Sequence, residues 1–221
     1  SDLIGPAIVI ALVSFAETYS VGKAISAETK QKLDLEGEYE VFCLNSNSIN
    51  AFAYVQPAEE KIFFIIGMTS AALEELEDLE IQFILGHELG HFLFEHNRMN
   101  YLINPNPTSQ GVTLLPSMGE SIFLRWRKKC EISTDRVGLL ACGDFENAAR
   151  AMLKTAYGLT GKNLNLDVDS LLQQIDDLKE EPEALEINYR SHPLMPLRLK
   201  VMQMFAESSI FTQVVNGKSD I

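Results

Sequence analysis

The chain has 221 residues, of which 46% are hydrophobic and 22% charged, a composition typical of a globular protein that buries a sizeable core. Its formal net charge of −13 argues against general nucleic-acid binding and against electrostatic attachment to anionic lipid, because both need clustered Lys and Arg. Three cysteines, Cys43, Cys130 and Cys142, have no CxxC spacing and form no disulfide framework. We therefore expect a reducing compartment and a cytoplasmic protein; a periplasmic or membrane-peripheral location is the alternative if upstream residues have been removed.

The only strongly apolar run near a terminus is Leu3–Ala16. It is too short to span a bilayer comfortably, and Pro6 lies inside it. A secretory signal would carry basic residues in front of such a run, where this chain has Asp2. We interpret the run as part of one or two helices between residues 4 and 33, and expect no transmembrane segment in this chain.

Three β-rich runs follow, separated by Asn, Ser, Pro and Glu: Tyr39–Leu44, Ala51–Gln56 and Lys61–Met68. Short runs with such separators predict a small antiparallel meander. The remainder of the chain has mainly helical patterns. The predicted fold class is therefore α+β, mainly helical, with a small and mostly antiparallel sheet.

Two helices are predicted to follow the last strand in the chain. Thr69 or Ser70 caps a short helix that runs through an acidic segment, and Leu79–Asn97 is apolar nearly all round, as a buried helix is. A loop or lid at 100–116 comes next. Further helices are predicted at Met118–Cys142, Asp144–Tyr157, Val168–Leu178 and Pro193–Glu207. A capping box of Ser117 and Glu120 opens the first of these, and Gly143 ends it.

The buried helix carries His87-Glu88-Leu89-Gly90-His91, an HExxH motif. Residues four apart on a helix project from one face, so both imidazoles can reach one ion, and zinc accepts such nitrogens in a tetrahedral site. Glu88 can then face the zinc-bound water and take its proton as the water attacks a carbonyl. The alternative is a core helix with two satisfied histidines, but burying these groups is costly unless each finds a partner.

A catalytic zinc needs a third protein ligand, and the best candidate is Glu131, forty residues past His91 on the helix predicted at Met118–Cys142. Asp135 lies one turn further on the same face, where it can accept the outer N–H of a ligand histidine and fix its tautomer. Acidic pairs at this spacing usually mark a solvated face. This pair indicates a metal site because it follows the HExxH motif and lies on a separate helix.

Four segments occur in an order that resembles one protease family: Asn50-Ala51-Phe52-Ala53, His87-Glu88-Leu89-Gly90-His91, Glu131 through Asp135-Arg136, and Ser191-His192-Pro193 with Arg198. The family is that of the HtpX-like proteases and the CAAX prenyl proteases, peptidase family M48, whose zinc centre is of the gluzincin type. The resemblance spans residues 50 to 198. Two features depart from the family pattern: Thr134 stands where Ala is common, and the transmembrane helices of many members are missing, which disfavours prenyl-protein processing.

The resemblance implies a zincin-like fold with an active-site helix and one Zn²⁺ per chain, bound by His87, His91 and Glu131. It implies Glu88 as the general base and Asp135 as a partner of a ligand histidine.

By the same resemblance, His192 would donate to the developing oxyanion and Arg198 would brace the acidic side of the site. The segment Asn50, Ala51, Phe52 and Ala53 would form an edge strand that pairs with a polypeptide substrate in extended conformation.

We expect a single catalytic domain over residues 1–221, with the sheet in 35–68, zinc-binding helices in 69–142 and a helical part in 143–221. The predicted function is a zinc-dependent metalloendopeptidase that uses a zinc-activated water. The alternative is a zinc-binding, latent or inactive member that acts as a binding or chaperone-like module, with 100–116 as a lid. The natural substrate and the oligomeric state stay open.

Three other residue types are expected to be structural. His96, five residues past His91, should turn away from the ligand face of the helix, either as a structural residue or as a capping group near the helix C-terminus. Trp126 and the methionines are expected to serve packing, and the cysteines are not needed as ligands.

Overall fold

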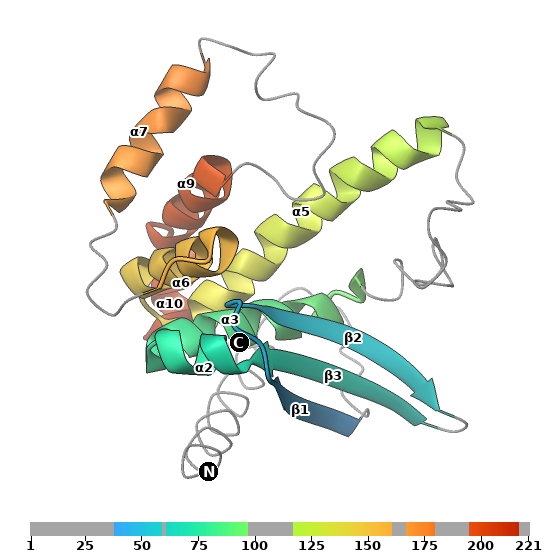
Figure 1. Ribbon diagram of the computed structural model, residues 1–221. Coiled ribbons are helices and arrows are strands. Elements are labelled where there is room, and N and C mark those ends of the chain that lie inside the picture. The colour runs from blue at the N-terminus through green and yellow to red at the C-terminus, as the bar shows by residue number, and fades with distance from the viewer. Residues whose placement is uncertain (1–37, 59–60, 97–116, 161–166, 180–194, 217–221) are drawn as a thin grey trace.

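The computed structural model of the protein describes residues 38–58, 61–96, 117–160, 167–179 and 195–216. Figure 1 shows a small twisted sheet beside a group of helices, which matches the predicted α+β class. Three predictions lie outside the described residues: the helices expected between residues 4 and 33, the loop at 100–116, and His192.

The sheet consists of β1 (Glu38–Leu44), β2 (Ala51–Ala58) and β3 (Lys61–Thr69). The predicted positions of all three strands are confirmed to within two residues at each end. The predicted antiparallel meander is wrong. The strand order is β1-β3-β2, with β2 antiparallel and β1 parallel to β3, so the sheet is mixed and β3 lies at its centre.

The connection between β1 and β2 explains this order. It passes over the end of β3, where the Asn50 N–H donates to Thr69 Oγ1 at 3.0 Å and the Ser46 N–H donates to Ser70 Oγ at 3.1 Å. These contacts hold β1 and β2 apart and leave the space between them for β3. Consecutive side chains of a strand point to opposite faces, and both Ile65 and Ile66 are buried, as expected for a central strand.

The described helices are α2 (Ser70–Glu75), α3 (Asp78–Leu93), α5 (Ser117–Cys142), α6 (Phe145–Tyr157), α7 (Val168–Lys179), α9 (Met195–Ala206) and α10 (Ser209–Val215). Those predicted with residue bounds begin and end within two residues of their predicted positions, except that α3 ends at Leu93 and not at Asn97. Thr69 caps α2 by accepting the Ala72 N–H, and Gly143, at φ 71°, ends α5 in the left-handed region. The final helix, α10, was not predicted; Ser208 caps it by accepting the Phe211 N–H.

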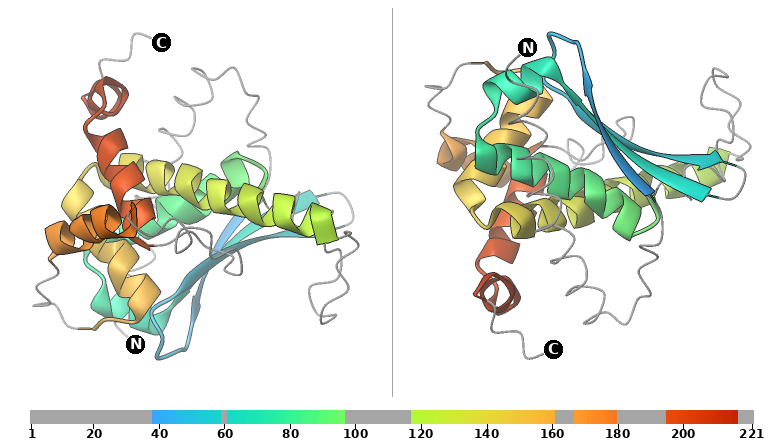
Figure 2. Two further views of the ribbon diagram at one scale, coloured as in Figure 1. Left: turned by 90° about the horizontal axis from the view of Figure 1, so that it is seen from above. Right: turned by 90° about the horizontal axis from the view of Figure 1, so that it is seen from below.

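Helix α3 is the centre of the structure, in contact with the sheet, α5 and α6. Most of its residues are buried, which confirms the prediction from its all-round apolar sequence. Helix α5 crosses α3, and Figure 2 shows the N-terminal part of α5 extending away from the other helices. Within the described residues, no helix combines the length and apolar character that crossing a membrane requires.

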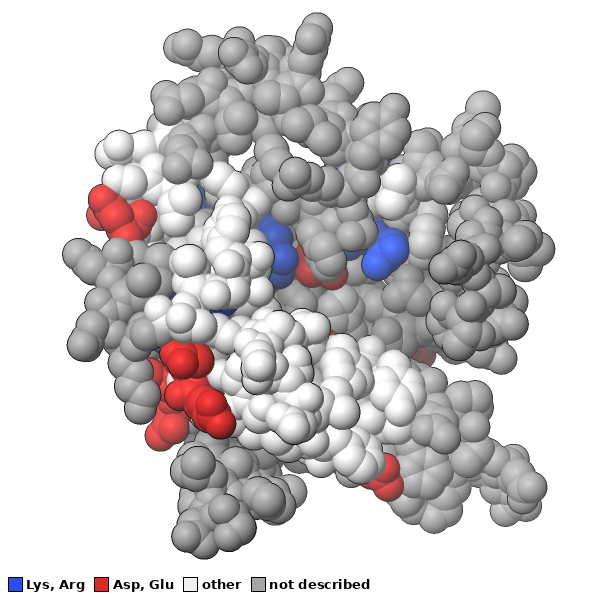
Figure 3. Space-filling model, in the orientation of Figure 1, with Lys and Arg blue, Asp and Glu red and all other residues white. Residues whose placement is uncertain are grey.

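The acidic residues at the junction of α2 and α3 are partly exposed and partly buried. Glu74, Glu77 and Asp78 are exposed, and Figure 3 shows acidic side chains gathered at the lower left, where Figure 1 places α2. Glu80 is fully buried, and its carboxylate accepts from Lys154 Nζ at 2.7 Å and from Arg150 Nε at 3.3 Å.

The Glu80 carboxylate also anchors the start of α3, because it accepts the Glu77 N–H at 2.8 Å. Lys154 Nζ donates to the Glu75 carbonyl at 3.1 Å as well. The buried pair of Glu80 and Lys154 therefore joins α6 to the end of α2 and to the start of α3. It thereby fixes where α3 begins.

Lys154→Met should lower the free energy of unfolding by about 3–5 kcal/mol, because it leaves the buried Glu80 carboxylate without its closest cation. Denaturant titration measures this change. Lys200→Met, on the exposed face of α9, is the control and should change stability by no more than about 0.5 kcal/mol. Equal effects of the two substitutions would show that the buried pair does not anchor α3.

Candidate metal centre

Helix α3 presents two imidazoles to one point. His87 and His91 lie one turn apart, and their Nε2 atoms are 3.3 Å from each other. Two nitrogens bound to zinc at about 2.0–2.1 Å in a tetrahedral arrangement lie about 3.3–3.4 Å apart. The separation of the two rings therefore fits one shared zinc ion.

Helix α5 brings a carboxylate to the same point. The Glu131 oxygens lie 3.7 Å from His87 Nε2 and 3.8 Å from His91 Nε2. Among the described residues, these three side chains form the group whose ligand atoms all lie within 4.8 Å of one another. Two imidazoles and one carboxylate are a donor set that zinc accepts, with a fourth position left for another ligand.

Small residues allow the two helices to come this close. A Cβ added at Gly138 of α5 would lie 2.7 Å from the Phe83 carbonyl oxygen, and one added at Gly86 would lie 2.6 Å from Ala141 Cβ. At Gly90, between the two histidines in the chain, an added Cβ would lie 3.1 Å from Thr134 Cγ2. The close approach of α5 therefore favours glycine at this position of the HELGH sequence.

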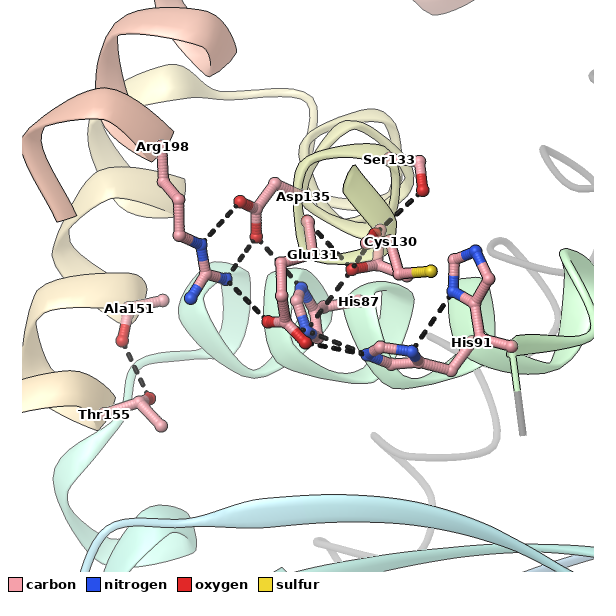
Figure 4. Close-up of polar contacts among 11 residues, drawn as sticks. His87, His91, Cys130, Glu131, Ser133, Asp135, Ala151, Thr155 and Arg198 are labelled. Atoms are coloured by element: carbon pink, nitrogen blue, oxygen red, sulfur yellow. Dashed lines mark hydrogen bonds and ion pairs between the residues drawn. The ribbon is translucent and has the colours of Figure 1, made fainter. Parts of the chain in front are cut away.

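Asp135 holds the outer nitrogen of the first histidine. Its Oδ1 lies 3.0 Å from His87 Nδ1, so the Nε2 of His87 faces Glu131 and His91, as Figure 4 shows. Burial alone would lower the pKa of His87, but the hydrogen bond and the charge of Asp135 outweigh it, and this pKa is raised. The carboxylate thus fixes both the orientation and the tautomer of the ring.

Arg198 of α9 holds Asp135 in turn. Its Nε donates to Oδ2 at 2.8 Å and its Nη2 donates to Oδ1 at 2.6 Å, and Nη2 also lies 3.5 Å from Glu131. Burial opposes ionisation of Asp135, but the charge and hydrogen bonds of Arg198, together with those of His87, outweigh burial and lower the pKa of the carboxyl. The sequence-predicted residues Arg198, Asp135, Glu131, His87 and His91 therefore lie in one continuous chain of contacts (Figure 4).

The second histidine is kept neutral. Burial, with the neighbouring positive charge of His87, lowers the pKa of His91 to about 3. Neutral imidazole is the form that binds a metal ion. The nitrogen of His91 that faces away from Glu131 lies 3.2 Å from Nδ1 of His96.

The expectation that His96 turns away from the site is therefore wrong. That expectation extended the α-helical geometry to residue 96, but α3 ends at Leu93. The expectation that Trp126 serves only packing is also too narrow, because Trp126 packs edge-on to His96 and lines the cavity beside the histidines.

This cavity has a volume of about 280 Å³. It is lined by Ala51, Phe52, Ala53, His87, Glu88, His91, His96, Trp126, Arg127, Cys130 and Glu131. Strand β2, which supplies the first three, is at an edge of the described sheet. Asn50 precedes the strand and is not a lining residue, since its backbone pairs with Thr69.

Arg127 and Cys130 line the cavity without having been predicted. Arg127 lies one turn before Glu131 on α5, so the helical spacing from Glu131 was a signal that could have placed it, whereas Cys130, directly before Glu131, had no such signal. Burial raises the pKa of the Cys130 thiol to about 11, which keeps it protonated.

The comparisons with known proteins identify a family. Residues 15–206 match the model of peptidase family M48. The chain is 29% identical over 187 residues to an Arabidopsis thaliana protein named plastoglobule-localized metallopeptidase 48, chloroplastic. That similarity covers 76% of this chain and 54% of the relative, so the chain spans little more than half of the relative's length. No solved structure matches significantly.

Gly138→Ala should push α5 away from α3, because its new Cβ meets the backbone of Phe83. We expect a stability loss of about 1–3 kcal/mol. We also expect zinc affinity to fall about 10-fold or more, because the Glu131 carboxylate moves away from the histidines. Denaturant titration and competition with a chelating indicator measure the two effects.

The control is Gly143→Ala, where φ is +71° and an added Cβ would contact no neighbouring element within 4 Å. Its backbone strain should lower the free energy of unfolding by about 1–2 kcal/mol and leave zinc affinity unchanged. If the two variants bind zinc equally well, the close approach of the helices does not set the geometry of the site.

Proposed function

This chain belongs to peptidase family M48, and on that basis we propose that it is a zinc-dependent metalloendopeptidase. The observation that carries the proposal is the convergence of His87, His91 and Glu131 beside a cavity that Glu88 also lines. His87 and His91 would hold the ion through their Nε2 atoms, and Glu131 would hold it through its carboxylate. When bound, zinc supplies a Lewis acid that polarises a carbonyl and lowers the pKa of water.

The electrostatic balance of the site supports a divalent cation. The negative charges of Glu88, Glu131 and Asp135 all stabilise the positive charge of the Arg198 guanidinium. Metal binding requires both histidines to be neutral, so in the zinc-bound state the three carboxylates and the one guanidinium would leave two negative charges in a largely buried site. Uncompensated buried charge is destabilising, and a divalent ion would offset it.

In this proposal Glu88 is the general base. It follows His87 in the chain and lines the cavity, while its two neighbours in the motif, His87 and Leu89, are buried. A half-buried carboxylate there can take the proton from the attacking water and pass it to the leaving nitrogen. Neither Asp135 nor Glu131 is available for this task, because Asp135 is engaged by Arg198 and His87 and Glu131 faces both ring nitrogens.

The substrate, in this proposal, is an extended polypeptide that adds to the edge of β2. Ala51 and Ala53 are small, so a second backbone can approach that side of the cavity, and Phe52 provides apolar contact. Asn50 would mark the start of this binding segment. His192 is proposed as the donor to the oxyanion, and it lies outside the described residues.

The proposed compartment is a reducing one. All three cysteines of the chain are free, with Cys43 exposed and Cys130 and Cys142 buried. A reducing compartment keeps such thiols unpaired.

Glu88→Gln should lower kcat for peptide hydrolysis by about 10²–10⁴-fold, because glutamine cannot take the proton from water. Zinc content should stay at one ion per chain, since His87, His91 and Glu131 are unchanged. Glu146→Gln, an exposed substitution on α6, is the matched control and should retain full activity. Full cleavage by the Glu88 variant would exclude the general-base role; absence of cleavage by the zinc-loaded wild type would favour a binding module instead.

A strong chelator should abolish cleavage of an unstructured protein such as casein, and one equivalent of Zn²⁺ should restore it. The reason is that the proposed ligands come from two helices and enclose a single ion site. Elemental analysis after gel filtration gives the stoichiometry. Cleavage that survives complete removal of metal would contradict the proposal.

A further inference from the structure

The chain reverses direction directly after α3, and the reversal returns His96 to the metal centre. Phe94 ends the helix, with its N–H donating to the Gly90 carbonyl at 3.1 Å. Glu95 then adopts φ 54°, a left-handed conformation that residues other than Gly rarely adopt. As a result His96 Nδ1 lies 3.2 Å from His91 Nδ1.

The His96 ring is fixed by its packing. Only 7% of the residue is exposed, and its ring meets Trp126 edge-on at 5.7 Å and an interplanar angle of 89°. Trp126 is itself stacked on Phe123, with ring centroids 5.4 Å apart. Such a ring cannot easily rotate away, so its Nδ1 is held beside the outer nitrogen of His91.

The chemistry of metal binding assigns the donor in this pair. Nε2 of His91 faces His87 and Glu131, so a metal ion would need the lone pair of that nitrogen. A neutral imidazole then carries its proton on Nδ1, and that N–H must find an acceptor. Nδ1 of His96 is at hydrogen-bond distance, and it can accept only if the proton of His96 is on Nε2.

We propose that His96 is a positioning residue of the metal centre, which accepts the Nδ1–H of His91 and so holds Nε2 of that ring toward the ion. This inference rests on the proposed zinc site. Each ligand histidine then has its own partner: a carboxylate, Asp135, for His87 and a neutral imidazole for His91. A neutral acceptor orients the second ring without adding another negative charge to a site that already has three carboxylates.

Two substitutions of His96 test its hydrogen-bond acceptor and its ring packing separately. His96→Phe keeps an aromatic ring against Trp126 but has no acceptor, whereas His96→Asn places an amide oxygen close to where Nδ1 lies. Zn²⁺ affinity is measured for wild type and both variants by competition with a chelating indicator. We expect His96→Phe to weaken binding about 10–100-fold and His96→Asn to stay within about threefold of wild type.

Wild-type affinity in His96→Phe would overturn the proposal, and so would equal weakening in both variants, since ring packing alone would then explain the effect. If His96→Phe does not fold, long-range ¹H–¹⁵N spectra of the zinc-loaded wild type decide. The proposal requires a proton on Nδ1 of His91 and on Nε2 of His96; a proton on Nδ1 of His96 overturns it. A wild type that binds no zinc would instead refute the proposed function, so the two failures are distinguishable.

Discussion

The close packing of α3 against α5 is the constraint on which the rest of the structure depends. At Gly86 and Gly138 the helices are so near that a single added carbon would lie within 3 Å of the neighbouring helix. Only at this distance can a carboxylate of α5 reach two imidazoles of α3. The same contact buries the largely apolar surface of α3, so the interaction that stabilises the fold also assembles the candidate metal centre.

A chain of charged contacts extends this arrangement into a third helix. Arg198 comes from α9, far along the sequence, and its paired hydrogen bonds fix the Asp135 carboxylate that orients His87. Breaking such a buried pair leaves an uncompensated charge, so the C-terminal helices contribute to the site without contacting the proposed ion. The separate Glu80–Lys154 pair performs a similar task at the start of α3, where it joins α6 to the turn before the helix.

Sequence patterns predict the local features well because those features depend on neighbours along the chain. The four-residue spacing of His87 and His91, the cap at Thr69 and the stop at Gly143 are all set within one turn. Strand order is not local: the antiparallel prediction failed because Asn50 and Thr69 pair across the end of β3. The uninterrupted apolar run of β3 was the available signal for its central position.

The role of His96 was missed for a different reason. Its placement depends on a left-handed residue, Glu95, and no glycine marks that reversal in the sequence. The cavity-lining position of Trp126 was missed because the cavity forms only where α5, β2 and the end of α3 meet. Which residues surround a site is a property of the assembled helices, whereas the ligand spacing within one helix can be read from the chain.

The most direct test of this account is X-ray absorption at the zinc edge of the zinc-loaded protein. A zinc ion bound by His87, His91 and Glu131 should have only nitrogen and oxygen neighbours at about 2.0–2.2 Å, with the outer scattering of two imidazoles. A sulfur neighbour at about 2.3 Å, which Cys130 beside the cavity could supply, or a single imidazole, would contradict this ligand set.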